Sequence, residues 1–177
     1  LTVAVLCGLA AFAFAKLAPP AQGFTPARSH RELGPRLWAN LRSPRQLVLY
    51  AQGFLLMGGF IAIYNFLGFR LMAAPFQLPQ TVVSLVFLAY LAGTWASARA
   101  GAEAIRFGRR TVLLVSIATM IVGVAVTLSD NLAAVLAGLV IATAGFFGAH
   151  AILSGWVGTA AAPEGKAQAS SLYNLFY

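Results

Sequence analysis

Long apolar runs separated by short polar connections dominate the chain. Six runs can be delimited: residues 1–18, 46–69, 80–104, 111–128, 132–159 and 167–177. A helix needs about 20 apolar residues to cross roughly 30 Å of hydrocarbon, and most of these runs approach or exceed that length. The pattern therefore predicts an all-α fold, a polytopic transmembrane helix bundle in which successive spans cross the membrane in opposite directions.

The longest polar connection covers residues 19–45 and carries five arginines against one acidic residue. Prolines at positions 26, 35 and 44 interrupt any long helix within it. Apolar residues recur there at helical spacing: Leu33, Leu37, Trp38 and Leu41. This spacing predicts a short amphipathic helix that lies on the membrane surface.

The composition indicates the same class of protein. Hydrophobic residues make up 60% of the chain and charged residues 9%, which leaves too little polar surface to coat a water-soluble globule. The formal net charge of +8 lies in connections and not on a face patterned with aromatic residues, so we expect no nucleic-acid partner. The single cysteine, Cys7, cannot build a disulfide framework or a thiolate metal site. We expect no metal and no cofactor, and a lipid bilayer as partner.

The basic residues fall on one side of the predicted membrane. All but one of the twelve lie in connections that share a side when the spans alternate in direction. They are Lys16, Arg28, Arg31, Arg36, Arg42, Arg45, Arg99, Arg106, Arg109, Arg110 and Lys166. Arg70 alone lies on the other side, which we call the outer side. By the positive-inside rule the basic side is the cytoplasm. The chain then divides into a first transmembrane helix (1–18), a basic cytoplasmic loop (19–45) and a bundle of further spans (46–177).

The connection over residues 101–110 reads GAEAIRFGRR. It resembles the signature loop of the major facilitator superfamily, G-x-x-x-D-R-x-G-R-R, which joins two transmembrane helices. The residues that match this loop in register are Gly101, Arg106, Gly108, Arg109 and Arg110. Ile105 stands where the family has an aspartate. The resemblance implies that the matching residues help to close a cytoplasmic gate; the alternative is a basic turn that fixes topology alone.

The order of the segments extends the resemblance to nearly the whole chain. A long basic loop followed two spans later by the signature turn is similar to the central loop and second six-helix half of a major facilitator. We therefore expect the chain to run from the end of helix 6 to the start of helix 11, with both ends cut and the N-terminal half missing. Three stretches, 64–70, 146–150 and 165–173, are similar to bacterial permeases described as arabinose-efflux or drug-efflux proteins.

The resemblance implies a secondary active transporter of the bacterial inner membrane. Its partners would be a small-molecule substrate, protons and the missing N-terminal half, and the expected activity is efflux by proton antiport with alternating access. Two alternatives stay open: an uptake symporter of the same fold, and a non-transporting scaffold or receptor. A membrane-embedded enzyme would need clustered catalytic groups within the spans, which this chain lacks. We therefore expect no enzymatic activity.

Polar side chains within spans are costly to bury unpaired, so they usually face a bundle interior or an aqueous cavity. The candidates for a substrate or proton pathway are Tyr64, Asn65, Tyr90, Thr94, Thr143, His150 and Ser154. Each has an ordinary alternative: a tyrosine can belong to an interfacial belt, and a helical hydroxyl can bond its own backbone.

His150 is the one histidine within a predicted span. Imidazole titrates near neutral pH, so His150 is a candidate for proton coupling; the alternative is a neutral histidine bonded to a neighbouring helix. No aspartate or glutamate lies within a span outside the signature connection 101–110, so an acidic coupling residue would come from the missing half. Gly138 and Gly145 lie on the opposite side of the same span, and small residues let helices approach, so that side should be the packed one.

Overall fold

The structure is a computed structural model that describes residues 2–19 and 30–177. Residues 20–29 of the predicted loop, which include Arg28, lie outside the described residues. The elements in order are α1 (Thr2–Leu17), η1 (His30–Glu32), α2 (Leu33–Arg42), α3 (Pro44–Met72), α4 (Gln80–Val83), η2 (Ser84–Ala89), α5 (Tyr90–Phe107), α6 (Arg109–Val126), α7 (Leu132–Ala160), η3 (Pro163–Gly165) and α8 (Lys166–Phe176), where η marks a 3₁₀ helix.

Four helical segments are long and apolar enough to cross a membrane: Pro44–Met72, Gln80–Phe107, Arg109–Val126 and Leu132–Ala160. They coincide with four of the predicted runs, and no strand occurs in the described part of the chain. The predicted fold class is confirmed: this is an all-α membrane helix bundle. The segment Gln80–Phe107 differs from a plain α-helix, because its Ser84–Ala89 portion is wound as a 3₁₀ helix.

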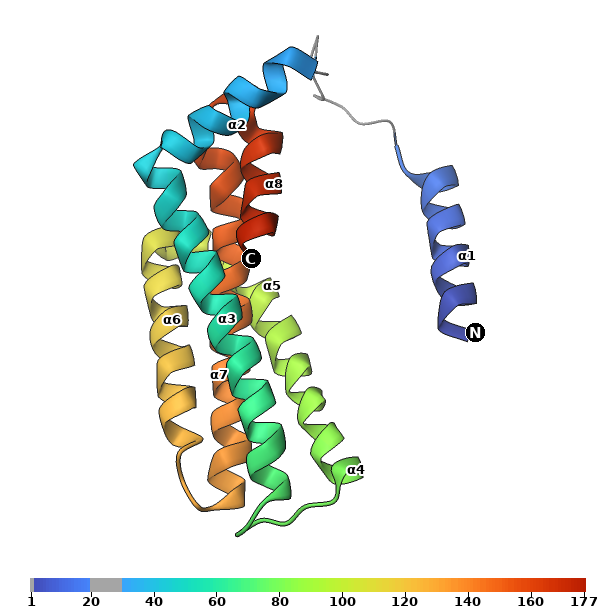
Figure 1. The fold of residues 1–177 in the computed structure, drawn as a ribbon, viewed down its shortest axis with the longest axis vertical. Helices are drawn as coiled ribbons and strands as arrows, with labels where there is room; N and C mark the ends of the chain where they lie inside the picture. Colours follow the sequence, from blue (N-terminus) through green and yellow to red (C-terminus); the bar gives the residue numbers. More distant parts are fainter. Residues whose placement is uncertain (1, 20–29) are drawn as a thin grey trace.

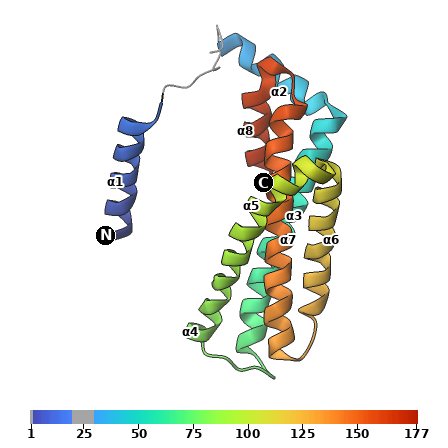
Figure 2. The same cartoon turned by 180° about the vertical axis from the view of Figure 1, so that it is seen from behind.

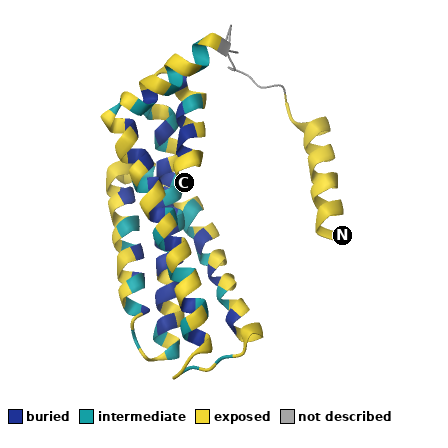
Figure 3. Cartoon of the chain, viewed as in Figure 1, coloured by how far each residue is buried: buried dark blue, intermediate teal, exposed yellow. Residues whose placement is uncertain are grey.

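Helix α7 forms the centre of the bundle. It packs against α3, α5, α6 and α8 (Figure 1). In the most apolar 18-residue stretch of α7, 50% of the residues are buried, whereas in the corresponding stretches of the other three candidate spans 17 to 28% are buried. The buried positions therefore follow α7 and the sides of the helices that face it (Figure 3).

The contact between α6 and α7 brings the two backbones together. A Cβ atom added to Gly145 would lie 2.4 Å from the Met120 nitrogen, and one added to Gly123 would lie 2.2 Å from the Ala142 nitrogen. A Cβ on Gly138 would likewise meet the Gly123 oxygen at 2.7 Å. The prediction that the glycine side of this span is packed is confirmed, and glycine is required because no side chain fits between the helices.

Helix α1 stands apart from the bundle (Figures 1 and 2). None of its residues is buried. Its 16 residues form a helix about 24 Å long, which is short for a complete span. The apolar surface of α1 thus finds no partner among the residues that the structure describes.

Helix α2 confirms the predicted helix in the basic loop, and part of its apolar side packs against the protein. Leu37 and Leu41 pack against the protein core. Arg36 donates a hydrogen bond to the Glu164 carbonyl at 3.1 Å, and the buried Asn40 donates to the Gly165 carbonyl at 3.2 Å. The expectation that this helix lies on the membrane surface stays a prediction; α2 packs across the N-terminal ends of α3 and α8 (Figure 1), and Trp38 is 56% exposed.

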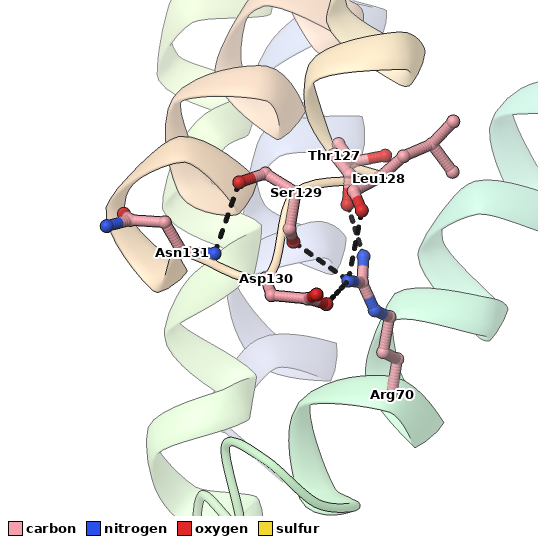
Figure 4. A network of polar contacts seen from close by, with 6 residues as sticks. All are labelled: Arg70, Thr127, Leu128, Ser129, Asp130 and Asn131. Atoms are coloured by element: carbon pink, nitrogen blue, oxygen red, sulfur yellow. Dashed lines mark hydrogen bonds and ion pairs between the residues drawn. The ribbon is translucent and has the colours of Figure 1, made fainter.

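At the outer end, Arg70 ties α3 to the turn between α6 and α7 (Figure 4). Its guanidinium donates to the carbonyl oxygens of Thr127 and Ser129, the latter at 2.8 Å, and pairs with the Asp130 carboxylate at 3.2 Å. The carbonyls at the end of a helix carry partial negative charge and lack intrahelical donors, so a guanidinium is a suitable cap. Asn131 caps α7, and its side chain accepts a hydrogen bond from Ala134 N at 3.1 Å, which satisfies one of the free amides at the start of the helix.

We expect Arg70→Gln to lower the free energy of unfolding by roughly 2 kcal/mol, because glutamine cannot satisfy the same carbonyls and leaves the α6 end uncapped. The measurement is thermal unfolding of the purified protein in detergent. Arg45→Gln is the matched control, since Arg45 is an exposed arginine at the opposite end of α3. Equal melting temperatures for the two variants would contradict the role of Arg70.

Candidate functional site

Aromatic side chains from four parts of the bundle meet beside α7. We call them the aromatic cluster: Phe60, Tyr64, Phe87, Tyr90, Phe146, Phe147, Tyr173 and Tyr177. The rings of Phe60 and Phe146 stack with centroids 3.9 Å apart, and those of Tyr64 and Tyr90 meet edge to face at 5.4 Å. Such pairs add about 0.5–1.5 kcal/mol beyond area burial, so the cluster has a defined arrangement.

Two glycines make room for rings of the cluster. A Cβ on Gly53 would lie 2.6 Å from the ring of Tyr173, and one on Gly93 would lie 2.5 Å from the ring of Phe147. The tyrosine of α8 and the phenylalanine of α7 therefore lie directly against the backbones of α3 and α5.

The cluster contains a hydroxyl pair formed by Tyr64 and Thr143. The Thr143 hydroxyl donates to the Leu139 carbonyl at 2.7 Å, which uses its single proton. The Tyr64 hydroxyl then donates to Thr143 Oγ1, at 2.8 Å. Thr143 is fully buried and Tyr64 partly exposed, so this pair satisfies a polar group inside the helix bundle and fixes the Tyr64 ring.

His150 lies on the α8 side of the same cluster. Its Nδ1 and the Tyr173 hydroxyl form a hydrogen bond of 3.0 Å. Its ring centroid lies 4.5 Å from that of Tyr177 and 6.1 Å from that of Phe146. His150, Tyr64 and Tyr90 are partly exposed, and we call the side of the cluster that they share its open face. The imidazole is therefore hydrogen-bonded to α8 and also borders this open face.

The other candidates lie outside these pairs. Asn65 is exposed on α3. The hydroxyls of Thr94 and Ser154 donate to carbonyls of their own helices, those of Tyr90 and Ala151, at 3.2 Å each. The structure thus brings Tyr64, Tyr90, Thr143 and His150 into one cluster and leaves the remaining three candidates at its margin or beyond it.

Helix α5 continues through Phe107, so most of the connection predicted over residues 101–110 is helical, and Gly108 alone separates α5 from α6. Gly108 has φ +83° and ψ 147° and forms both the C-cap of α5 and the N-cap of α6. Arg109 donates a hydrogen bond to the Thr159 hydroxyl on α7. Ile105 is 91% exposed, so the side chain at the aspartate position of the signature makes little contact within the described chain.

Comparison with known proteins adds the family. The chain is 34% identical over 177 residues to the uncharacterized MFS-type transporter YybF of Bacillus subtilis (strain 168), a match that covers 99% of this chain and 44% of YybF. It is 42% identical over 172 residues to the inner membrane transport protein YnfM of Escherichia coli (strain K12), covering 94% of this chain and 40% of YnfM. The chain belongs to the major facilitator superfamily.

A third relative is an uncharacterized transporter of Buchnera aphidicola subsp. Schizaphis graminum, 38% identical over 140 residues, or 79% of this chain and 34% of the relative. The chain spans less than half the length of these curated relatives. No family model and no solved structure matches it.

Sequence reasoning missed several residues that build the site of this superfamily member. Phe60, Phe146 and Tyr173 hold the cluster together but are ordinary apolar or aromatic residues in apolar runs. Gly53 and Gly93 carried a usable signal, because an isolated glycine in a transmembrane helix often marks a close approach. Which ring fills the space beside each glycine becomes known only from the packed helices.

Gly108→Ala tests the signature turn. Its φ and ψ lie in a region that is accessible in practice only to glycine, so we expect the variant to lose about 1–3 kcal/mol of unfolding free energy or to rearrange the turn. Thermal unfolding measures this loss. Gly101→Ala is the control, because it lies within α5 with nothing within 4 Å of its added Cβ, and alanine favours the helix. If both variants melt alike, the backbone of Gly108 is not a special requirement.

Proposed function

We propose that the protein is a secondary active transporter of the bacterial inner membrane that exports a small organic molecule in exchange for protons. Residues 46–177 would form most of its second helix bundle, with 19–45 as the cytoplasmic loop between bundles and 1–18 as a helix of the first bundle. The lack of buried residues in α1 supports this division. Membership of a superfamily whose relatives are named transporters supports transport itself.

The observation that carries the proposal is the open face of the aromatic cluster. Helices α3, α5, α7 and α8 contribute rings and hydroxyls to a single face, and Tyr64, Tyr90 and His150 on it are partly exposed. Transporters of this kind bind substrate near the bilayer midplane, between two bundles that rock around the site. In this proposal Tyr64, Tyr90 and Thr143 contact or orient the substrate, while Asn65, Thr94 and Ser154 border its path.

His150 would carry the proton in this scheme. Its side chain is held by the Tyr173 hydroxyl and borders the open face, so proton binding at the imidazole can alter the same surface that meets the substrate. Competition between proton and substrate for one surface is the requirement for antiport.

The signature turn would act as part of the cytoplasmic gate. Gly108 forms the turn, Gly101 lies in the last turns of α5, and Arg109 links the turn to α7 through Thr159. Arg106 and Arg110 extend the positive charge on the same turn. Because α7 also carries the aromatic cluster, a movement of α7 would be transmitted to this turn.

The test is transport by the full-length protein in inverted membrane vesicles, with ethidium and arabinose as probes. Export by antiport predicts that a probe accumulates inside the vesicles when a proton gradient is present, and that an ionophore that collapses the gradient stops accumulation. Accumulation that persists without a gradient would refute proton coupling. Gradient-driven movement in the opposite direction would indicate a symporter. A second experiment replaces Tyr64 by cysteine and tests whether a water-soluble thiol reagent labels it. If neither probe is transported and the cysteine is not labelled, transport through this face is refuted.

A further inference from the structure

One face of α3 carries two buried polar side chains with unpaired atoms. Gln46, Tyr50 and Gly53 lie at positions i, i+4 and i+7, so they share this face of the helix. Gln46 is 1% exposed and Tyr50 is 0% exposed. No residue that the structure describes donates a hydrogen bond to Gln46 Oε1 or pairs with the Tyr50 hydroxyl. Buried polar atoms in proteins nearly always have a partner, and internal water is the usual partner where side chains supply none.

This face of α3 begins at a pocket at the end of the bundle that bears α2. The pocket has a volume of about 420 Å³ and is lined by residues of α2, the start of α3 and the segment that follows α7. Gln46 is one of the lining residues, and its Nε2 donates to the Val157 carbonyl at 3.1 Å. This bond fixes the orientation of the amide, so Oε1 is the atom left without a donor. Arg36 and Asn40 also line the pocket, and a polar pocket of this size holds water.

The same face of α3 ends beside the residue that holds His150. The ring of Tyr173 lies against Gly53, where an added Cβ would be 2.6 Å from it. The Tyr173 hydroxyl and His150 Nδ1 form a hydrogen bond of 3.0 Å. The distance along α3 from Gln46 to Gly53 is about 10 Å, and Tyr50 lies between them. Polar groups therefore follow α3 from the pocket to the imidazole.

An aromatic ring of α8 closes this face in the present structure. The ring of Phe176 stacks on that of Tyr50, with centroids 5.3 Å apart and planes at 9°. Neither of the two unpaired atoms is accessible to water. Phe176 is 37% exposed, so its ring has space into which it can turn. A turn of this ring would uncover Tyr50 while the helices stay in place.

We propose that Gln46, Tyr50 and Tyr173 form a hydrated proton route from the pocket to His150, with the Phe176 ring as its gate. The inference rests on the proposed role of His150 in antiport. When the gate opens, water from the pocket bonds to Gln46 Oε1 and the Tyr50 hydroxyl. A water beside Tyr173 gives a proton to its hydroxyl oxygen while the hydroxyl hydrogen passes to His150 Nδ1. Tyr173 ends with one hydroxyl hydrogen, as it began, and the imidazole becomes an imidazolium.

The first experiment tests whether water reaches Tyr50. The full-length protein in lipid nanodiscs is exposed to radiolytic hydroxyl radicals, which oxidise side chains that contact water, and oxidation is read by mass spectrometry. We expect Tyr50 to be oxidised although it is buried, and its oxidation rate to rise several-fold in Phe176→Ala. Leu67 is the internal control, because it is 1% exposed on the same helix within an apolar cluster. If Tyr50 is as unreactive as Leu67 in both proteins, no water enters and the route is overturned, whether or not antiport occurs.

The second experiment tests whether the route carries protons. Proton release from the full-length protein on binding of ethidium is followed with a pH indicator in stopped flow. Tyr50→Phe keeps the ring under Phe176, and we expect it to slow release roughly tenfold, a barrier change of about 1.4 kcal/mol. The amount of proton released and the affinity for ethidium should stay unchanged. Gln46→Leu should act alike, and Tyr50→Phe alone decides the result if that variant does not fold.

Gln52→Leu is the matched control for proton release. Gln52 also has an unpaired, buried Oε1 on α3, but it lines a groove between α3 and α6. It should release protons at the normal rate. An equal delay in Gln52→Leu, or a normal rate in Tyr50→Phe, would overturn the route. If the unmodified protein releases no proton, the proposed antiport is refuted, and the oxidation of Tyr50 still decides whether water reaches this face.

Discussion

Gly145→Val is expected to remove most of the folded protein. A Cβ at this position would lie 2.4 Å from the Met120 nitrogen and 2.6 Å from the Ser116 oxygen, and both atoms belong to the backbone of α6. A side chain can turn away from a new methyl group, but a helix backbone can only move as a whole. We expect a loss of more than about 3 kcal/mol, at or above the upper end of the usual cost of overpacking. Total stabilities lie near 5–15 kcal/mol, so little folded protein would remain at working temperatures.

The measurement is the yield of monodisperse protein and its melting temperature in detergent. Gly155→Val is the matched control, because Gly155 lies on the same helix and nothing lies within 4 Å of its added Cβ. Both variants introduce the same β-branched residue into α7, so any intrinsic cost in helix propensity cancels. If the two variants are equally stable, the close approach of α6 and α7 does not hold the bundle together.

The helices of this protein could be predicted because membrane thickness fixes their length. The run 132–159 became α7 (Leu132–Ala160), and its start follows from Asn131, which caps it. The 3₁₀ winding of Ser84–Ala89 could not be predicted, since an apolar run is compatible with either helix type. The partner of Arg70 was also hidden, because its main acceptors are backbone carbonyls that every sequence contains.

The packing of the helices was less predictable than their positions. Lipid is as apolar as a protein core, so an apolar face in a membrane helix does not reveal whether it meets lipid or another helix. Small residues carried the information that apolar residues lacked: Gly138 and Gly145 identified the packed side of α7. In α2 the apolar spacing predicted the helix but not its contacts with the bundle, because Leu37 and Leu41 suit a membrane surface and a protein surface equally well.

The candidate site was predictable where polarity marked it. Tyr64, Thr143 and His150 are polar residues within apolar runs, and hydrogen bonds in the structure connect each of them to a neighbour. The aromatic rings that surround them lacked such a mark. The functional roles of all these residues stay predictions, because geometry gives their neighbours and not their part in transport.

His150→Gln is expected to reduce proton-driven export by roughly tenfold or more in the vesicle assay. Glutamine can still form a hydrogen bond with the Tyr173 hydroxyl, but it cannot bind a proton near neutral pH as imidazole does. A loss of about 1.4 kcal/mol in coupling corresponds to the tenfold effect. We expect ethidium to bind the variant with nearly unchanged affinity, because the rings of the cluster stay in place.

Tyr173→Phe separates proton handling from positioning. The variant keeps the ring against Gly53 and removes only the hydroxyl that holds His150 Nδ1. We therefore expect proton-driven export to fall by about fivefold, less than in His150→Gln, because one hydrogen bond contributes about 1 kcal/mol. Ser84→Ala, outside the candidate site, is the control and should export normally, since its hydroxyl donates only to the Thr81 carbonyl of the same helical segment. The decisive readout is the pH dependence of export: it should disappear in His150→Gln and persist in Tyr173→Phe. If His150→Gln exports with an unchanged pH profile, the proton is carried elsewhere in the protein and His150 has a structural role.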